Sequence, residues 1–446
     1  MFNFSTKIYL IVSLCLYIVL ISKNSEEYFL INTVNIFSVI SFYGILYINA
    51  HMKLKNYTRN YLNIEVFIYS LIFISSYNFI SYFYSGDFFV FSKADALFYH
   101  NQTIQMINME FGEAIEHYLS YMGTDDLGMI LVLFPLYHIA ESNIILNILY
   151  LFVGIVTSIS IFSISQKIMS KKYAFLSTLS YSLSSFVLYF HSIGLKESFM
   201  VMLVVLSFDF YYKFIKTKNI LYILLVLLFI GTILLFRPAV SVIIIASIGI
   251  GSLLGKKSGI AIKLVSLLIL IFLISIGDNI IKIIEHYSRG GFDMLIYSRE
   301  AEGMIIGSIP FTYTVNILSQ LIGPLPTLVS SEKIMLTLIA PSLIYRVFLS
   351  FPFWMGAWYI YKTKIYIIYP LLLFVLMEMS SLALILEGLE FRKSLPHIAI
   401  VFIIAFWFMD KYDSRQLIWE KRKKFKLFYK FSILILILII IFWNFK

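Results

Sequence analysis

Long apolar segments alternate with short polar ones along the chain, and this pattern predicts its secondary structure. An α-helix needs about 20 consecutive apolar residues to cross a bilayer, with some tolerance for tilt. We therefore predict an all-α, polytopic integral membrane protein with about 13 transmembrane helices, within a range of roughly 11 to 14. The predicted spans are 8–22, 30–49, 64–84, 143–165, 173–191, 197–214, 219–236, 239–255, 259–277, 334–361, 365–386, 395–409 and 429–443.

The basic residues between these spans predict how the chain lies in the membrane. Cytoplasmic loops carry an excess of Lys and Arg. All the main clusters fall on one side if the N-terminus is cytoplasmic, and Arg392 and Lys393, beside Glu387 and Glu390, are the main exception. The clusters on the common side lie at 53–59, 167–172, 213–218, 256–257, 362–364 and 411–426. The net charge of +10 is thus explained by membrane orientation, and we expect no nucleic-acid partner.

Two polar stretches on the opposite, outer side are too long to lie within the bilayer. We predict one integral membrane domain over residues 1–446, with a first outer loop at 85–127 and a second, larger one at 278–333. A basic loop at 410–428 is predicted on the cytoplasmic side. Each outer loop contains apolar residues at helical spacing, and in the second loop this pattern begins at Pro310. We therefore expect short interfacial helices in both.

Composition agrees with a membrane protein. The 446 residues are 60% hydrophobic and 13% charged, whereas soluble domains carry about a quarter charged residues. The mean hydropathy is +0.88. Cys15 is the only cysteine, so an internal disulfide is excluded. The first apolar run follows Lys7 and lacks a small-residue cleavage site, so we expect it to be retained as a helix.

Asp95 is the first candidate for chemistry. The chain has no P-loop, dinucleotide fingerprint, His/Cys metal spacing or nucleophile elbow. No cofactor is therefore expected, although a requirement for a divalent metal stays open. Asp95 follows a predicted span and shares one face of a predicted helix with Tyr99 and Gln102. A carboxylate in that position can take a proton from an acceptor hydroxyl, and a solvated loop carboxylate is the alternative.

Cations at the outer turns form a second group of candidates. Lys196 and Glu197 lie in one short outer turn, and Arg237 lies in the next. Arginine binds phosphate groups through two parallel hydrogen bonds. The alternative is that these side chains extend to the lipid headgroups. Because basic residues are depleted on the outer side, their presence there favours an anion-binding role.

The second outer loop adds two arginines and a histidine. Arg289 and Arg299 lie on either side of Gly290-Gly291, which suggests a flexible anion clamp. Surface ion pairs with nearby glutamates are the alternative. His286 titrates near neutral pH and is a candidate proton shuttle.

A few charges fall within the predicted spans. Asp209 and Lys213 are one helical turn apart, so we expect them to pair. Arg346 and Glu378 lie near mid-depth on consecutive spans. Because an unpaired charge there is costly, we predict an ion pair between them, with a role in a substrate cavity as the alternative.

Four short motifs carry a resemblance to a known class of enzymes. Lys93-Ala-Asp95-Ala-Leu-Phe-Tyr99 resembles the acidic motif that multi-span glycosyltransferases of the GT-C type place in their first outer loop. Gly194-Leu-Lys196-Glu197 and Leu235-Phe-Arg237-Pro238 resemble turns recurrent in such proteins, and Gly323-Pro324-Leu-Pro326 follows the arginines of the large loop. Among bacterial proteins, the chain resembles the O-antigen and capsule repeat-unit polymerases.

The resemblance implies a function, a location and partners. Such an enzyme polymerises undecaprenyl-diphosphate-linked oligosaccharide repeat units of lipopolysaccharide O-antigen or capsule, at the periplasmic face of the bacterial inner (cytoplasmic) membrane. Its partners are the lipid-linked oligosaccharide, the lipid bilayer, and the chain-length regulator and flippase of the same pathway. The catalytic residues would be Asp95, which takes the acceptor proton, and Arg289 and Arg299, which neutralise the departing diphosphate. The substrate-binding residues would be Tyr99, Lys196, Glu197, Arg237 and His286.

Three other functions stay open at this stage. One is a GT-C transferase that adds a single sugar from a polyprenyl-phosphate donor. Another is a lipid-linked saccharide flippase or other transporter, for which broken helices and related halves are typical. The third is a structural membrane protein without catalysis. Convergence of Asp95, Lys196, Arg237, Arg289 and Arg299 in space would favour an enzyme over a structural protein.

Overall fold

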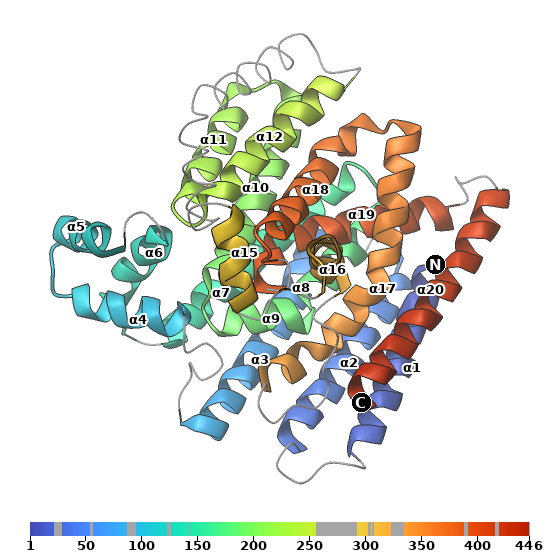
Figure 1. Ribbon diagram of the computed structural model, residues 1–446, viewed down its shortest axis with the longest axis horizontal. Helices are drawn as coiled ribbons and strands as arrows, with labels where there is room; N and C mark the ends of the chain where they lie inside the picture. Colours follow the sequence, from blue (N-terminus) through green and yellow to red (C-terminus); the bar gives the residue numbers. More distant parts are fainter. Residues whose placement is uncertain are drawn as a thin grey trace.

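The computed structural model forms a bundle of helices with a smaller helical lobe at one side (Figure 1). None of the described residues forms a β-strand, which confirms the all-α class. The predicted span 259–277 and much of the second outer loop lie outside the described residues. The structure describes residues 1–21, 29–53, 57–86, 95–122, 126–141, 143–255, 292–301, 305, 307–322, 334–387, 391–414 and 419–445.

Eight of the described helices are long and apolar enough to cross a membrane. Two of the eight include a short 3-10 turn, η4 (Tyr366–Ile368) before α18 and η5 (Phe391–Ser394) before α19. The eight are α2 (Phe29–Ala50), α3 (Arg59–Ser85), α7 (Asn143–Gln166), α10 (Lys196–Thr217), α17 (Ile334–Thr363), α18 (Tyr369–Leu384), α19 (Leu395–Asp413) and α20 (Trp419–Phe445).

The remaining described helices do not meet this criterion of length and hydropathy: some are apolar, and the others lie in the predicted loops or in the predicted span 173–191. The apolar ones are α1 (Phe2–Ile21), α6 (Leu127–Tyr137), α11 (Ile220–Leu234) and α12 (Pro238–Leu254). The others are α4 (Asp95–Met106), α5 (Phe111–Met122), α8 (Lys171–Ser182), α9 (Ser185–Ser192), α15 (Phe292–Ala301) and α16 (Ile309–Ile322). The predicted basic loop at 410–428 covers the end of α19 and the first turns of α20.

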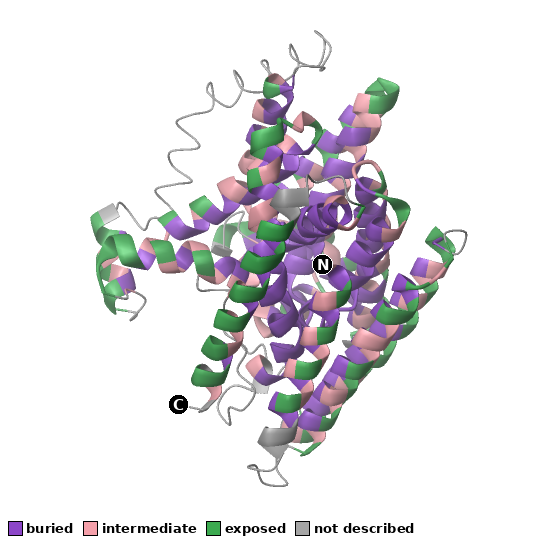
Figure 2. Ribbon diagram, turned by 90° about the vertical axis from the view of Figure 1, so that its right-hand side faces the viewer, coloured by how far each residue is buried: buried purple, intermediate pink, exposed green. Residues whose placement is uncertain are grey.

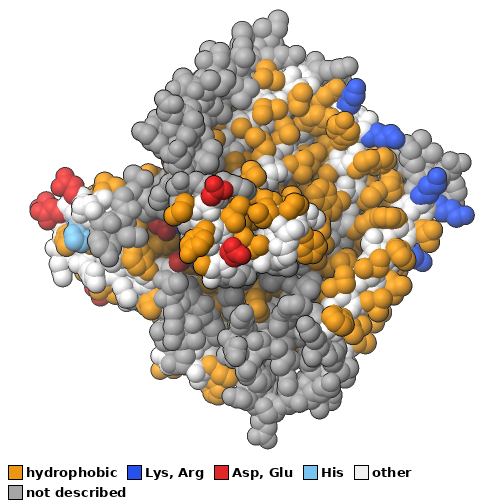
Figure 3. Space-filling view, in the orientation of Figure 1, with side chains coloured by type: hydrophobic (Ala, Val, Ile, Leu, Met, Phe, Trp, Pro, Cys, Tyr) orange, Lys and Arg blue, Asp and Glu red, His pale blue; other side chains and the backbone are white. Residues whose placement is uncertain are grey.

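The helices differ sharply in how deeply they are buried (Figure 2). In the spanning segments of α17 and α19, 94% of the residues are buried, against 22% in α20. The exposed side chains of α20 include Leu427, Phe431 and Phe442. Figure 3 shows a wide hydrophobic surface on one face, with basic side chains along its right-hand edge and acidic ones at the left and centre. Apolar side chains exposed in this way match a surface that faces lipid tails.

The predicted span 173–191 is not one helix but two, α8 and α9. They are separated at Leu183 and Ser184, and every residue from 173 to 192 is buried. The free N–H groups at the start of α9 find a partner in α17, because Phe186 N donates to Ser342 Oγ at 2.7 Å. A broken helix is tolerated at membrane depth where protein surrounds it and supplies the missing hydrogen bonds.

α16 confirms the predicted helix near Pro310, but its polar face points into the protein. Gln320 is fully buried and donates from Nε2 to Met379 O at 2.8 Å, while Phe311 and Leu318 are exposed. An interfacial helix would hold its polar residues in water. α16 has the reverse arrangement, because it packs its polar side against α17 and α18.

The α4–α6 lobe is fastened to the bundle at the start of α6. Gly128 N donates to Leu235 O at 2.8 Å. A Cβ at Gly128 would lie 2.6–2.7 Å from ring atoms of Phe236, so only glycine allows this approach. The first loop therefore rests directly against the turn that precedes Arg237.

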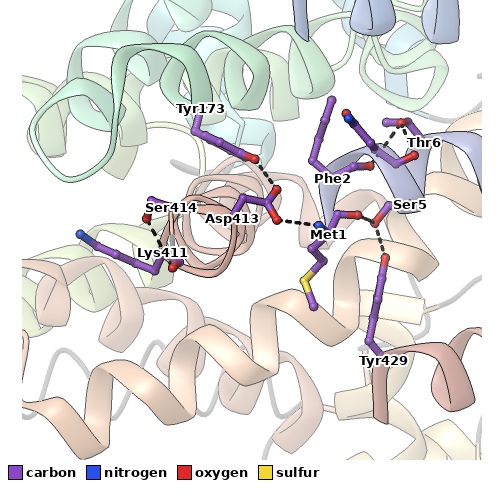
Figure 4. A network of polar contacts seen from close by, with 10 residues as sticks. Met1, Phe2, Ser5, Thr6, Tyr173, Lys411, Asp413, Ser414 and Tyr429 are labelled. Carbon is purple, nitrogen blue, oxygen red and sulfur yellow. Dashed lines mark hydrogen bonds and ion pairs between the residues drawn. The ribbon is translucent and has the colours of Figure 1, made fainter. Parts of the chain in front are cut away.

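The N-terminal segment is held by helices from much later in the chain (Figure 4). The α-amino group of Met1 donates to Asp413 Oδ1 at 2.7 Å, and Tyr173 donates to the other oxygen of the same carboxylate. The hydroxyls of Ser5 and Tyr429 also hydrogen-bond to each other. α1 is thus anchored to α8, α19 and α20.

Candidate functional site

A cavity of about 380 Å³ lies where α4, α10, α12, α18 and η5 meet. This volume falls within the usual range of ligand pockets, about 300–1,000 Å³. We call it the charged cavity, because its lining includes four acidic and four basic side chains. They are Asp95, Lys196, Glu197, Arg237, Glu378, Glu387, Arg392 and Lys393.

The rest of the lining is mainly apolar and comes from two helices. Ala239, Val240 and Ile243 belong to α12, whereas Leu382 and Leu384 belong to α18. Leu384 is 60% exposed at the outside of the bundle. The apolar part of the lining therefore continues into exposed apolar surface at Leu384.

Four of the predicted site residues meet in this cavity. The starts of α10 and α12 bring Lys196 and Glu197 together with Arg237, and the start of α4 brings Asp95. Glu197 Oε1 and Arg237 Nη2 lie 3.6 Å apart, with Glu197 1% exposed. Oε2 of Glu197 is also buried and has no hydrogen-bond partner among the described residues.

Asp95 forms an ion pair with Arg392 of η5. Both side chains are about one-third exposed, at 32% and 33% respectively. An exposed pair of this kind contributes little to stability, because water screens it. It can therefore open to admit a charged ligand at small cost.

Lys196 and Tyr99 are joined by Asp126, which the sequence prediction had not included. Lys196 donates to one carboxylate oxygen of Asp126, and Tyr99 donates to the other at 2.7 Å. Burial raises the pKa of the Tyr99 hydroxyl far above its ordinary value, and the Asp126 carboxylate adds to this shift. Tyr99 thus remains a hydrogen-bond donor that holds Asp126, and it does not itself line the charged cavity.

Arg299 reaches the cavity indirectly, through Glu387. Arg299 Nη2 and Lys393 Nζ each lie 2.6 Å from a carboxylate oxygen of Glu387. Burial alone would raise the pKa of Glu387, but the Lys393 ammonium and the Arg299 guanidinium outweigh it and hold this pKa below its ordinary value. Arg299 is only 2% exposed and does not itself line the charged cavity, so it acts by holding Glu387 in place.

The predicted ion pair between Arg346 and Glu378 is wrong. Glu378 lies beside His397 of α19, with Oε2 3.4 Å from Nδ1. Arg346 instead lies over the ring of Phe186, with its Cζ 5.1 Å from the ring centroid. α19 packs against both α17 and α18, so a neighbour from a third helix takes the place that the sequence order suggested for Arg346.

The other predicted pair within the spans is confirmed. Lys213 Nζ lies 2.8 Å from Asp209 Oδ2, and Lys167 Nζ lies 2.7 Å from Asp209 Oδ1.

Three charged lining residues were missed, and one sequence signal could have found all three. Arg392 and Lys393 were the main exception to the expectation that basic residues lie on the cytoplasmic side, and Glu387 lies just before them. A basic pair predicted on the outer side, next to an acid, could have indicated these three residues. Glu378 was considered for a substrate cavity only as the alternative to the ion pair with Arg346. The predicted site residues Arg289 and His286 lie outside the described residues.

Among the residues that the structure describes, no three His, Cys, Asp or Glu side chains are grouped so as to hold a metal ion. Comparison of the chain with models of protein families, with curated protein sequences and with solved structures found no match.

Proposed function

We propose that this protein is a membrane glycosyltransferase that polymerises lipid-diphosphate-linked oligosaccharide repeat units. The observation that supports it is the convergence of Asp95, Lys196, Glu197 and Arg237 in one cavity whose lining combines charged groups with apolar side chains of α12 and α18. A lipid-linked sugar has the same division, with a polar head and a long apolar chain. We place the cavity at the periplasmic face of a bacterial inner membrane, with the N-terminus in the cytoplasm.

The four basic side chains of the charged cavity would bind the diphosphate of the substrate. Lys196, Arg237, Arg392 and Lys393 are each balanced by a carboxylate when no substrate is bound. A diphosphate would exchange these partners for its own oxygens. Charge that grows on the leaving diphosphate in the transition state would then be stabilised by groups already in place, an effect that often supplies several kcal/mol.

The apolar wall between α12 and α18 suits the isoprenoid chain. Ile243 and Leu384 lie on this wall, and Leu384 extends it to the outside of the bundle. A lipid tail lying there would keep its apolar surface out of water. Its head group would then lie directly beside Arg237.

Complementation of a strain that lacks this gene tests the proposal. We expect the wild-type gene to restore a surface-polysaccharide ladder on a gel, and Arg237→Ala to leave a single repeat unit. Lys216→Ala is the matched control, because Lys216 is an exposed cation at the far end of the helix that begins with Lys196. Membrane abundance is compared for every variant.

Two other outcomes would reject polymerisation. Long chains that lack one sugar branch would identify a single-sugar transferase. A complete loss of lipid-linked repeat units from the outer face would identify a transporter.

A further inference from the structure

A buried carboxylate and a buried imidazole face each other at the charged cavity. Glu378 is 2% exposed and lines the cavity, and His397 behind it is fully buried. Their closest atoms, Oε2 and Nδ1, are 3.4 Å apart. Both carboxylate oxygens and both ring nitrogens lack a hydrogen-bond partner among the described residues. Buried polar groups are normally satisfied, so four such atoms beside a cavity point to a missing ligand.

The other carboxylates of the charged cavity already have cationic partners. Asp95 pairs with Arg392, Glu197 pairs with Arg237, and Glu387 accepts from Lys393. A carboxylate held by a neighbouring cation is a weaker base, because the cation favours its charged form. Within the described part of the chain, Glu378 is the lining carboxylate with no Lys or Arg within 4 Å.

The remaining surroundings of Glu378 are known from each helix packed against α18. α12 carries no ionisable side chain, α16 contributes uncharged amides, among them Gln320, and α19 contributes His397. The titratable groups that share the cavity with Glu378 are Asp95, Lys196, Glu197, Arg237, Glu387, Arg392 and Lys393. Glu378 thus faces the space in which four cations would hold a diphosphate, and its oxygens are free to accept a hydroxyl proton.

We propose that Glu378 is the catalytic base of the transfer, and that His397 is the residue that positions it. This inference rests on the proposed function, and it moves the role of base from Asp95 to Glu378. The acceptor sugar's O–H bond breaks, and its proton passes to the Glu378 carboxylate. The acceptor oxygen bonds to the anomeric carbon of the donor, and the bond from that carbon to the diphosphate oxygen breaks. Its electron pair leaves on the diphosphate, beside Arg237 and the lysines.

His397 can fix the carboxylate without touching the sugar. A ring N–H directed at Glu378 would hold one oxygen and leave the other toward the cavity. The 3.4 Å separation is longer than a normal hydrogen bond, and such contacts often tighten only when substrate is bound.

The test measures how fast the polysaccharide ladder grows after each variant is induced in the deletion strain. General-base catalysis contributes about 10²–10⁴-fold, so Glu378→Gln should grow no ladder during the time course, while Glu378→Asp keeps part of the rate. Glu65→Gln is the matched control, because Glu65 is a partly buried glutamate of α3 that is bonded to Asn49 and does not line the charged cavity. It should grow the ladder at the wild-type rate.

The role of His397 is tested through a conservative substitution, measured by the same rate. His397→Asn keeps an N–H donor near the place of Nδ1 and should retain part of the rate, whereas His397→Leu should lose it, a difference that a purely structural role would not produce. A wild-type rate in Glu378→Gln would overturn the inference while Arg237→Ala still supports the function. If Glu378→Gln does not accumulate in the membrane, a wild-type rate in His397→Leu overturns it instead. A normal ladder in the deletion strain would reject the proposed function itself.

Discussion

Replacing Gly251 by alanine should force apart the two helices that form the apolar wall of the charged cavity. A Cβ at Gly251 of α12 would lie 2.7 Å from Pro370 Cγ, 2.8 Å from Pro370 N and 2.9 Å from Pro370 Cα. Carbon atoms pack best at about 3.5–4.0 Å, so α12 and α18 would have to separate by roughly 1 Å. Two of the three obstructing atoms belong to the backbone, which cannot rotate away as a side chain can. Overpacking of this kind costs about 1–3 kcal/mol.

A matched glycine isolates this cost from the helix preference of alanine. Gly231 lies within α11, and a Cβ there would meet nothing within 4 Å. Alanine favours a helix over glycine by about 1 kcal/mol, so Gly231→Ala should unfold in detergent at or above the wild-type temperature. Gly251→Ala should unfold at a lower temperature than Gly231→Ala and grow a shorter ladder. Equal unfolding temperatures for the two variants would refute the close packing of α12 on α18.

Two further predictions concern buried charges. Arg346 is 2% exposed, and its guanidinium nitrogens lack hydrogen-bond partners among the described residues. Because burying a charge without such partners is costly, Arg346→Met should raise the unfolding temperature in detergent. A lower unfolding temperature would contradict this. The pKa of Glu387 lies below its ordinary value, so the stability it contributes is fully present above about pH 4.5 and is lost as the pH falls through its lowered pKa. Arg299→Gln removes one cause of the lowered pKa, so the loss of stability in acid should begin at higher pH. Unfolding curves measured over a pH series would show this. If the pH at which stability is lost does not change, Lys393 alone lowers the pKa.

The simple rules of membrane insertion predicted a large part of the candidate site. Lys196 and Arg237 were chosen because basic side chains are unusual on the outer side, and both line the charged cavity. The same rule had singled out Arg392 and Lys393 as exceptions, although they were not assigned to the site. Charged side chains at the ends of spans are confined to the membrane surface, so the turns that carry them tend to meet there.

Helix neighbours and helix faces were harder to predict. Glu378 was paired with Arg346 because their spans are consecutive, whereas packing in three dimensions gave it His397. α16 was read as interfacial because its apolar residues repeat at helical spacing. Periodicity separates two faces but does not say which faces lipid, and in a membrane the polar face can be the inner one. The break between α8 and α9 depends on Ser342, a hydrogen-bond acceptor from a distant helix.

The anchoring of α1 has a consequence for the order in which the chain assembles. α1 contacts residues that are synthesised 412 and 424 positions later, since the Met1 amino group bonds to Asp413 and Ser5 bonds to Tyr429. α1 must therefore stay in the bilayer without these partners until α19 and α20 have been inserted. Contacts so distant in sequence form slowly, because a long loop must close before they stabilise the fold. Docking of α1 is thus a late event in biogenesis. In a chain stalled before α20, the surface of α1 that contacts α20 would stay uncovered and accessible to membrane proteases.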